Sequence, residues 1–231
     1  MKIAIGTSGF QYPEWRGKFY PETLSTAKML GFYAEHFRTT ESNYSFRRIP
    51  SEKTIANWSA GTPADFCFSL KAPQKITHFA KLRDCMETVD FFWKIVRGLE
   101  AKLGAILFQL PPSLKKDVPL LAAFLDGLPA EMRAAFEFRH ESWFDDEVFT
   151  TLQTRGAALC VAESSDLKTP RVATAPFGYL RLRREDYRPA ELSELARWVR
   201  EQKWKDACLY FKHEELAIGP KFALAMQKLL G

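Results

Sequence analysis

Short apolar runs alternate along the chain with longer stretches whose apolar residues recur every three or four positions. The first pattern predicts strands and the second predicts amphipathic helices. A predicted helix follows every strand except the sixth. Such alternation is typical of parallel strands joined by right-handed crossovers. Eight strand units predict a single (β/α)8 barrel of the TIM type, forming one domain over residues 1–231. The predicted strands are residues 3–8, 39–43, 66–71, 104–110, 134–139, 157–163, 178–183 and 206–212, and the predicted helices are residues 25–37, 51–59, 87–99, 118–128, 147–155, 189–202 and 220–230.

Side-chain size also alternates along these strands. The third, fourth and fifth strands carry bulky apolar residues on one face, and small residues that end in a polar group on the other. Residues of a barrel strand point alternately to the lumen and to the surrounding helices. We therefore expect the bulky face to meet the helices and the smaller face to line the lumen. The bulky residues are Phe66, Phe68, Leu70, Ile106, Phe108, Leu110, Phe136 and Phe138.

Polar or charged residues end nearly every predicted strand, at the barrel end where enzymes of this fold place their active sites. Burying a charge costs several kcal/mol unless it is paired, so these groups form either a mutually neutralising structural network or a polar pocket for a ligand. We favour the pocket. The cations in this set predict a ligand with a carboxylate or phosphate. The residues are Ser8, Glu41, Asn43, Lys71, Gln109, Glu137, Arg139, Glu163, Arg181, Arg183 and Lys212.

Two of these residues, Glu41 and Glu137, are candidate catalytic groups. A pair of carboxyl groups performs acid–base chemistry when the surroundings separate their pKa values. His78, which follows the third strand, is the candidate proton carrier. By analogy with other barrels the expected reaction class is hydrolysis. The sequence does not give the distance between the two glutamates, so a glycosidase-like pair and a metal site both stay open.

A metal-dependent, nuclease-like barrel is one alternative. His78, His140 and His213 lie near the predicted rim and would supply ligands together with the glutamates. No HxH or HExxH spacing supports this arrangement, and the four cysteines form no CxxC motif. We therefore assign no metal ligand and identify no cofactor.

Aromatic residues near the rim are further ligand-binding candidates. The glycine-rich loop after the first strand contains Tyr12 and Trp15, and His140 and Trp143 follow the fifth strand. Glycines let backbone N–H groups turn toward an anion, and the aromatic side chains would form an apolar wall. The same loop aromatics would equally serve to plug the barrel mouth.

The net charge of +5 arises entirely in the first half, where residues 1–110 hold 15 Lys and Arg against 10 Asp and Glu. This excess, with aromatics beside Arg16 and Lys18, is compatible with a second alternative, a nucleic-acid-binding protein without catalysis. No apolar run reaches the roughly 18 residues that a membrane span needs. We expect a cytoplasmic protein whose N-terminus lies inside the fold.

Several motifs resemble the DUF72 (YecE-like) family in sequence order over roughly residues 1–145. The first loop reads Gly-Thr-Ser-Gly-x-x-Tyr-x-x-Trp-x-Gly-x-Phe-Tyr-Pro from Gly6 to Pro21. Later motifs are Glu41-x-Asn43-x-x-Phe46, Phe66-x-Phe68-x-x-Lys71 with Ile76-Thr77-His78, Leu103-Gly104-x-x-Leu107-x-Gln109-Leu-Pro-Pro112, and Phe136-Glu137-x-Arg139-His140-x-Ser142-Trp143. The resemblance implies a TIM-type barrel and does not specify a reaction.

The last third departs from the family pattern at two rim positions. Where the family usually reads Tyr-x-Arg-x-His-Gly in strand seven, this chain keeps Tyr179 and Arg181 but continues with Arg183 and Arg184. Strand eight of the family usually ends in two Asn residues, whereas in this chain the strand ends in Phe211-Lys212-His213. Both changes add basic groups, which favours a more anionic ligand or a divergent activity.

Overall fold

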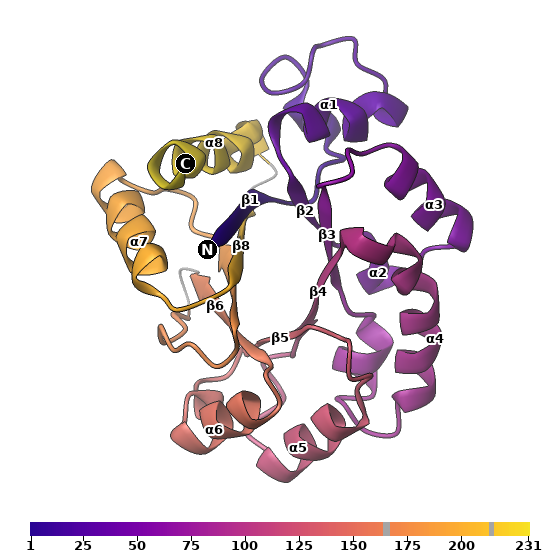
Figure 1. Cartoon of the computed structure of the whole chain (residues 1–231), viewed down its shortest axis with the longest axis vertical. Coiled ribbons are helices and arrows are strands. Elements are labelled where there is room, and N and C mark those ends of the chain that lie inside the picture. The colour runs from indigo at the N-terminus through magenta and orange to yellow at the C-terminus, as the bar shows by residue number, and fades with distance from the viewer. Residues whose placement is uncertain (164–166, 213–214) are drawn as a thin grey trace.

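Eight parallel strands close into a barrel in the computed structural model, which describes residues 1–163, 167–212 and 215–231 (Figure 1). Each strand pairs with the next along the chain, and β8 pairs with β1 to complete the ring. The predicted (β/α)8 barrel is therefore confirmed. The strands are β1 Lys2–Ser8, β2 Thr39–Ser42, β3 Cys67–Lys71, β4 Leu103–Gln109, β5 Ala134–Glu137, β6 Ala158–Glu163, β7 Phe177–Leu182 and β8 Asp206–Phe211.

Helices surround the barrel on its outside (Figure 1). As expected, the described part of the β6–β7 connection, residues 167–176, contains no helix. No helix in the described ranges is long and apolar enough to cross a membrane. The α-helices are α1 Met29–His36, α2 Tyr44–Arg47, α3 Glu52–Ala60, α4 Met86–Val96, α5 Val118–Gly127, α6 Asp146–Thr154, α7 Pro189–Glu201 and α8 Ile218–Leu230. The shorter turns are 3₁₀ helices Pro13–Trp15, Thr26–Lys28, Arg97–Lys102, Glu141–Trp143 and Glu215–Ala217, and a π-helix Lys75–Phe79.

Local capping groups start the helices where the sequence predicts. The Ser51 hydroxyl accepts a hydrogen bond from the backbone N–H of Thr54, and the Asp117 carboxylate accepts one from Leu120 at 3.0 Å. These bonds satisfy N–H donors that lack a partner within the helix. The sequence prediction misses several short elements, among them α2 and the π-helix, because none of these is long enough to display a helical period. Both α2 and the π-helix follow strand ends at the barrel mouth.

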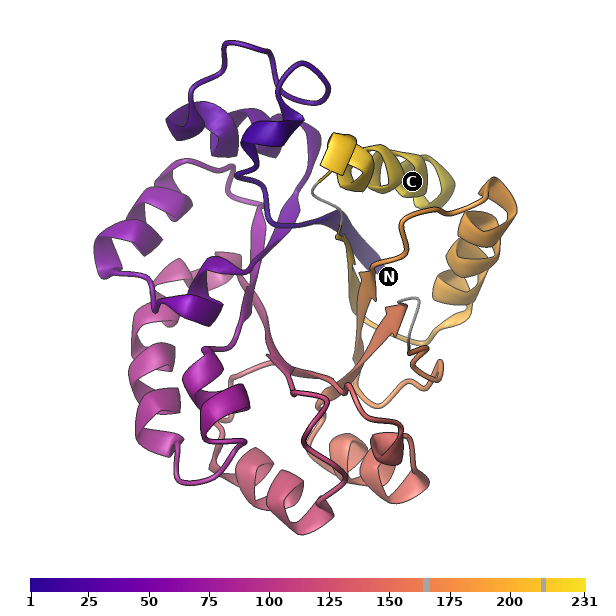
Figure 2. The same cartoon turned by 180° about the vertical axis from the view of Figure 1, so that it is seen from behind.

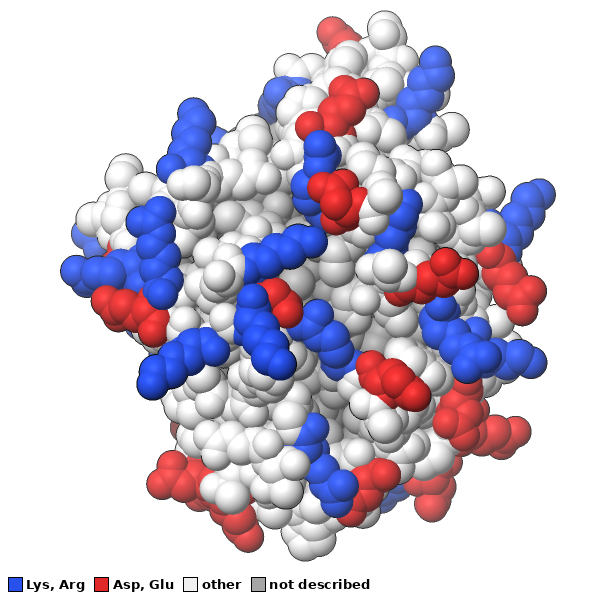
Figure 3. Space-filling model, in the orientation of Figure 1, with Lys and Arg blue, Asp and Glu red and all other residues white. Residues whose placement is uncertain are grey.

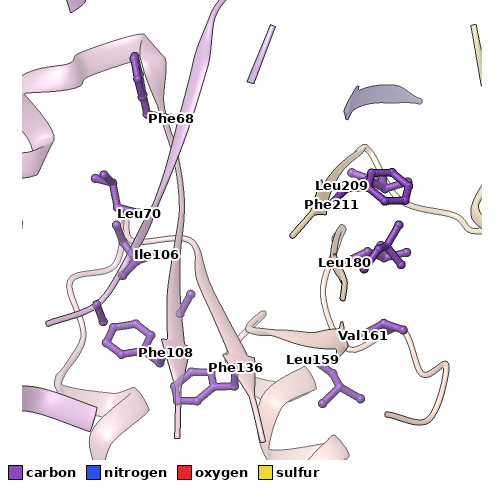
Figure 4. Packing of buried hydrophobic residues seen from close by; sticks show 14 of the residues in the cluster. Phe68, Leu70, Ile106, Phe108, Phe136, Leu159, Val161, Leu180, Leu209 and Phe211 are labelled. Carbon is purple, nitrogen blue, oxygen red and sulfur yellow. The ribbon is translucent and has the colours of Figure 1, made fainter. Parts of the chain in front are cut away.

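Bulky and small strand residues separate to the two faces of the barrel wall, as predicted. The bulky side chains point outward from the ring of strands and join the helices in the main core (Figure 4). A separate cluster of mainly small residues with two tyrosines fills the lumen. This alternation brings the polar residues near the strand ends onto the lumen face. The lumen cluster consists of Ala105, Leu107, Ala135, Ala158, Cys160, Ala162, Phe177, Tyr179, Cys208 and Tyr210.

The carboxyl ends of the strands meet at the face seen in Figure 2, which is opposite the face seen in Figure 1. The loop after β1, the short helix α2 and the π-helix after β3 all lie at this mouth because each directly follows a strand end. A polar layer lies deeper in the lumen. There the Tyr210 hydroxyl donates to Ser69 and is 2.8 Å from Thr39 Oγ1, so these buried hydroxyls are paired. Buried side chains with paired hydroxyl groups therefore fill the lumen below the mouth.

Candidate functional site

Arg181 forms the centre of the site. Its guanidinium group, contributed by β7, contacts Glu41 from β2 and Glu137 from β5, and all three side chains are almost completely buried. Arg181 Nε donates to Glu41 Oε1 at 3.0 Å, and its NH1 group donates to Glu137 Oε2. Burial alone would lower the pKa of Arg181, but the two carboxylates hold it well above its usual value. The guanidinium is therefore a permanent cation between two anions.

Both carboxylate oxygens of Glu41 are occupied. Oε1 accepts from the Ser8 hydroxyl as well as from Arg181, and Oε2 accepts from the Tyr179 hydroxyl at 2.7 Å. Burial and the neighbouring Glu41 charge raise the pKa of Tyr179 well above its usual value, so this hydroxyl keeps its proton. The Asn43 amide extends the network by donating to Ser8 Oγ at 3.0 Å. These contacts suit Glu41 to a positioning role.

Glu137 differs from Glu41 because one of its oxygens lacks a hydrogen bond. Oε1 lies in ion-pair contact with Arg139 and 3.9 Å from the NH1 group of Arg183, yet neither guanidinium is aligned to donate to it. The Nε–H groups of Arg139 and Arg183 are also buried without an acceptor. Unsatisfied buried donors and acceptors are rare and costly. Glu137 Oε1 and the two arginine Nε–H groups are thus three buried polar atoms that lie close together without a hydrogen-bond partner.

Lys71 and Gln109 form the adjoining part of the mouth. Lys71 Nζ donates to Gln109 Oε1 at 2.8 Å and lies 3.9 Å from the centre of the Phe46 ring. Burial is the main cause that lowers the pKa of Lys71 to about 8. The nearby positive charges of Arg181 and Lys212 also lower this pKa, whereas the negative charges of Glu137 and Glu41 raise it. The ammonium group is therefore a destabilised cation that an anion would stabilise.

His78 lies beside this lysine, in the π-helix after β3. Its ring meets the edge of Phe46 at 5.0 Å, and its Nδ1 is 2.9 Å from the Thr77 hydroxyl. Partial burial and the charge of Lys71 lower its pKa, which keeps the imidazole neutral at pH 7. Single π-helical turns occur frequently at functional sites. The geometry is compatible with the proton-carrier role expected from the sequence.

Other sequence candidates lie at the edge of this centre. Lys212 directly follows β8, and its charge reaches Lys71. His140 Nδ1 accepts from the backbone N–H of Ser142 and starts the turn after β5. Tyr12 donates to the Ser8 carbonyl at 2.8 Å. Glu163 is instead paired with Arg171, and His213 lies outside the described residues.

Trp15 and Trp143 are not brought to the centre. Trp143 is fully buried, stacks on Phe138 at 4.6 Å and donates from its indole nitrogen to the Leu114 carbonyl. Trp15 is 1% exposed and lies among the aromatics of the first loop, 5.8 Å from the ring of Tyr20. Trp15 and Tyr20 belong to the main core, where Tyr20 packs against Phe32 of α1, whereas Tyr12 stays partly exposed.

The donor chemistry at the centre does not favour the metal alternative. Among the described residues there is no group of three or more His, Cys, Asp or Glu side chains able to hold a metal ion. The space between the two glutamates already holds a cation, because Arg181 bridges them. A metal ion there would have to displace a guanidinium group that is hydrogen-bonded to both carboxylates.

Comparison with known sequences gives relatives over part of the chain. The UPF0759 protein YecE of Escherichia coli K12 is 32% identical over 143 residues, which are 62% of this chain and 50% of YecE. The UPF0759 protein YunF of Bacillus subtilis 168 is 30% identical over 150 residues, which are 62% of this chain and 52% of YunF. The chain thus spans about half the length of the curated relatives it matches.

Solved structures match over the whole chain. A DUF72 family protein from Thermotoga maritima MSB8 has a TM-score of 0.89 at 27% identity and covers 100% of this chain and 99% of its own. A DUF72 family protein from Enterococcus faecalis V583 has a TM-score of 0.81 at 19% identity. The match covers 99% of this chain and 95% of the Enterococcus protein, which shows the shared fold. The family model described as "Protein of unknown function DUF72" matches residues 4–231. The chain therefore belongs to the DUF72 family.

Proposed function

We propose that the barrel mouth binds a ligand carrying a phosphate or carboxylate group and that Glu137 then promotes its hydrolysis. One observation carries the binding step. The Nε–H donors of Arg139 and Arg183 are buried beside Glu137 and have no acceptor. Guanidinium groups form strong, charge-assisted hydrogen bonds with phosphate and carboxylate oxygens. An anion at the mouth would supply the acceptors that these two arginines lack.

The charge balance of the mouth supports the same ligand class. Five cationic side chains from the described strand ends accompany three carboxylates, Glu41, Glu137 and Glu163, and Glu163 is already paired with Arg171. The lowered pKa of Lys71 reflects burial together with part of this excess. An anionic ligand would offset the repulsion and stabilise the charged form of the lysine. The cations are Lys71, Arg139, Arg181, Arg183 and Lys212.

The two glutamates would divide the work of hydrolysis. Glu41 is saturated by donors and holds Arg181 in place. Glu137 Oε1 accepts no hydrogen bond and is held chiefly by its ion pair with Arg139, so once the ligand anion draws Arg139 toward itself this oxygen would take a proton from an attacking water. His78 is neutral at pH 7 and lies beside Lys71, where a ligand anion would bind. Glu137 is therefore the proposed catalytic base.

The nucleic-acid alternative has less support. On the face in Figure 3, which is the end of the barrel where the strands begin, Lys and Arg side chains are interspersed with Asp and Glu. A continuous basic stripe is the usual electrostatic footprint of a nucleic-acid-binding surface. The cations that do gather surround buried carboxylates within the barrel mouth, which suits a small anion.

Isothermal titration calorimetry with inorganic phosphate and with acetate tests the binding step. We expect one anion per chain, with affinity about tenfold or more weaker in Arg139→Met and Arg183→Met, since each loses a charge-assisted hydrogen bond. Arg38→Met is the matched control, because Arg38 is half exposed and pairs only with Asp65 among the acidic residues described. Absence of binding by either anion, or equal affinity in all four proteins, would overturn the proposal.

A further inference from the structure

A small pocket opens beside the charged mouth. It has a volume of about 140 Å³ and lies between the first loop, the end of β2 and helix α3. Its walls are largely aromatic and include two amides, Gln11 and Asn43, of which Asn43 connects to the charged centre through Ser8. The residues that matter here are Phe10, Tyr12, Asn43, Tyr44 and Trp58.

The size of this pocket matches a single six-membered ring. An apolar cavity of about 150 Å³ in another protein accommodates benzene. The rings of Tyr44 and Trp58 lie nearly perpendicular, at 82° with centres 6.0 Å apart, so they form two adjoining walls. Aromatic rings pack favourably both stacked and edge to face, and this corner offers a planar guest both arrangements. A planar aromatic ring therefore fits the pocket better than an extended chain.

Neighbouring contacts hold these walls in place. The other face of Trp58 stacks on the buried Phe68 at 5.6 Å and 13°. Tyr12 is fixed by its hydrogen bond to the Ser8 carbonyl and by its contact with Trp15. Tyr44 is 45% exposed, so part of its ring surface is available to a guest. A pocket formed in advance binds without the cost of ordering its walls.

The pocket adjoins the anion site through two short connections. Asn43 lines the pocket and donates to Ser8 Oγ, which also lies 3.3 Å from the NH2 group of Arg181. Helix α2 makes the second connection, because it carries Tyr44 at the pocket and Phe46 beneath the Lys71 ammonium group. The pocket and the cationic centre are therefore adjoining parts of the mouth, joined through Ser8 and helix α2.

We infer that the ligand is an aryl anion, in which one aromatic ring is joined directly or through a short link to a phosphate or carboxylate group. This inference rests on the proposed anion site and adds the identity of the group beside it. The charged mouth selects the anion, and the pocket of Tyr12, Tyr44 and Trp58 selects the ring.

Two matched ligand pairs test the inference by calorimetry: phenyl phosphate against methyl phosphate, and benzoate against acetate. We expect the aryl member of the pair that fits to bind about tenfold tighter than its partner, the gain typical of one stacked ring. Tyr44→Ala should remove that gain and leave the affinity for the small anion unchanged, whereas Tyr44→Phe should retain it. Phe91→Ala, which removes an exposed aromatic on α4, should change nothing.

The outcomes separate the two proposals. If the small anions bind but the aryl anions bind no tighter, or if the gain survives in Tyr44→Ala, the ring subsite is wrong and the anion site stands. If none of the four ligands binds, the anion site is wrong and the ring subsite falls with it. The pair that shows the gain also identifies the anionic group as phosphate or carboxylate.

Discussion

Arg181 Nε lies 3.0 Å from Glu41 Oε1, and this bond joins two strands, β7 and β2, that are not neighbours in the barrel. The same guanidinium contacts Glu137 on β5. The centre of the mouth is therefore a crosslink through the lumen, formed by charges that would be costly to bury separately. The groups proposed to bind the ligand are arranged around it, which links the stability of the barrel to its proposed function.

Removal of Arg181 should strongly destabilise the fold. Arg181→Met leaves two buried carboxylates without their shared cation, and breaking a buried pair costs about 3–5 kcal/mol of unfolding free energy. Denaturation in urea measures this loss. Arg38→Met is the exposed comparison, and loss of its ion pair with Asp65 should cost at most about 1 kcal/mol. Equal stability of the two variants would contradict the buried crosslink.

Glu137→Gln should have opposite effects on binding and on turnover. The substitution removes a negative charge from the anion site, so inorganic phosphate should bind more tightly than in the wild type. It also removes the proposed base, so hydrolysis of aryl phosphates to a phenol and inorganic phosphate should be lost while the circular dichroism spectrum stays unchanged. Titration calorimetry and release of the phenol measure the two effects. Retained turnover would exclude Glu137 as the base.

Anion affinity should fall as the pH rises through about 8. Lys71 has its pKa lowered to about 8, so it is charged below this value and neutral above it, and attraction for an anion is lost in the same direction. Sulfate is a suitable probe because its own charge is constant from pH 6 to about 9. Lys71→Met should bind sulfate weakly at every pH in this range. A wild-type affinity that does not change with pH would show that Lys71 makes no contribution.

Alanine substitutions at Gly9 and Gly17 test whether Tyr12 forms a wall of the pocket that is proposed to bind the aromatic ring. Both have a positive φ, 98° and 72°, so alanine at either position costs about 1–2 kcal/mol of backbone strain. A Cβ at Gly9 would also lie 2.3 Å from the Tyr12 hydroxyl oxygen, whereas one at Gly17 meets nothing within 4 Å. Gly9→Ala should therefore displace Tyr12 and weaken phenyl phosphate binding, and Gly17→Ala should lower stability alone. Equal ligand affinity in the two variants would remove Tyr12 from the pocket.

The sequence predicts which strand-end side chains face the lumen, because residues along a barrel strand point alternately inward and outward. Lys71, Gln109 and Glu137 lie on the inward side of their strands, as the alternation with bulky residues indicates. Glu41 also contacts the lumen centre, although its strand carries no bulky residue to reveal the alternation. The same rule applied to β7 identifies Tyr179, two residues before Arg181, as a lumen residue that contacts the site. Its donation to Glu41 is absent from the sequence prediction, although the alternation pattern contains the signal.

Aromatic residues at the mouth were less predictable. Trp15 and Trp143 sit near glycines and charged residues in the sequence, yet both are buried in apolar packing. Tyr44 and Trp58, which line the pocket, were not candidates, because α2 is too short to show a period and Trp58 comes from a helix outside the barrel. Large aromatics serve cores and pockets equally well, so only their three-dimensional neighbours distinguish the two roles.

The crosslink at the barrel centre also affects how the chain is made. Glu41 and Glu137 both precede Arg181 in the sequence, so during synthesis the two acidic groups emerge before the guanidinium that neutralises them. Burial of the lumen by the first five strands in that interval would enclose Glu41 without its cation and leave Glu137 paired with Arg139 alone among the residues described, which is costly. Closure of the barrel and neutralisation of its centre thus become one event on the ribosome. A nascent chain that stalls before β7 should keep its inner surface open to water, accessible to chaperones and proteases.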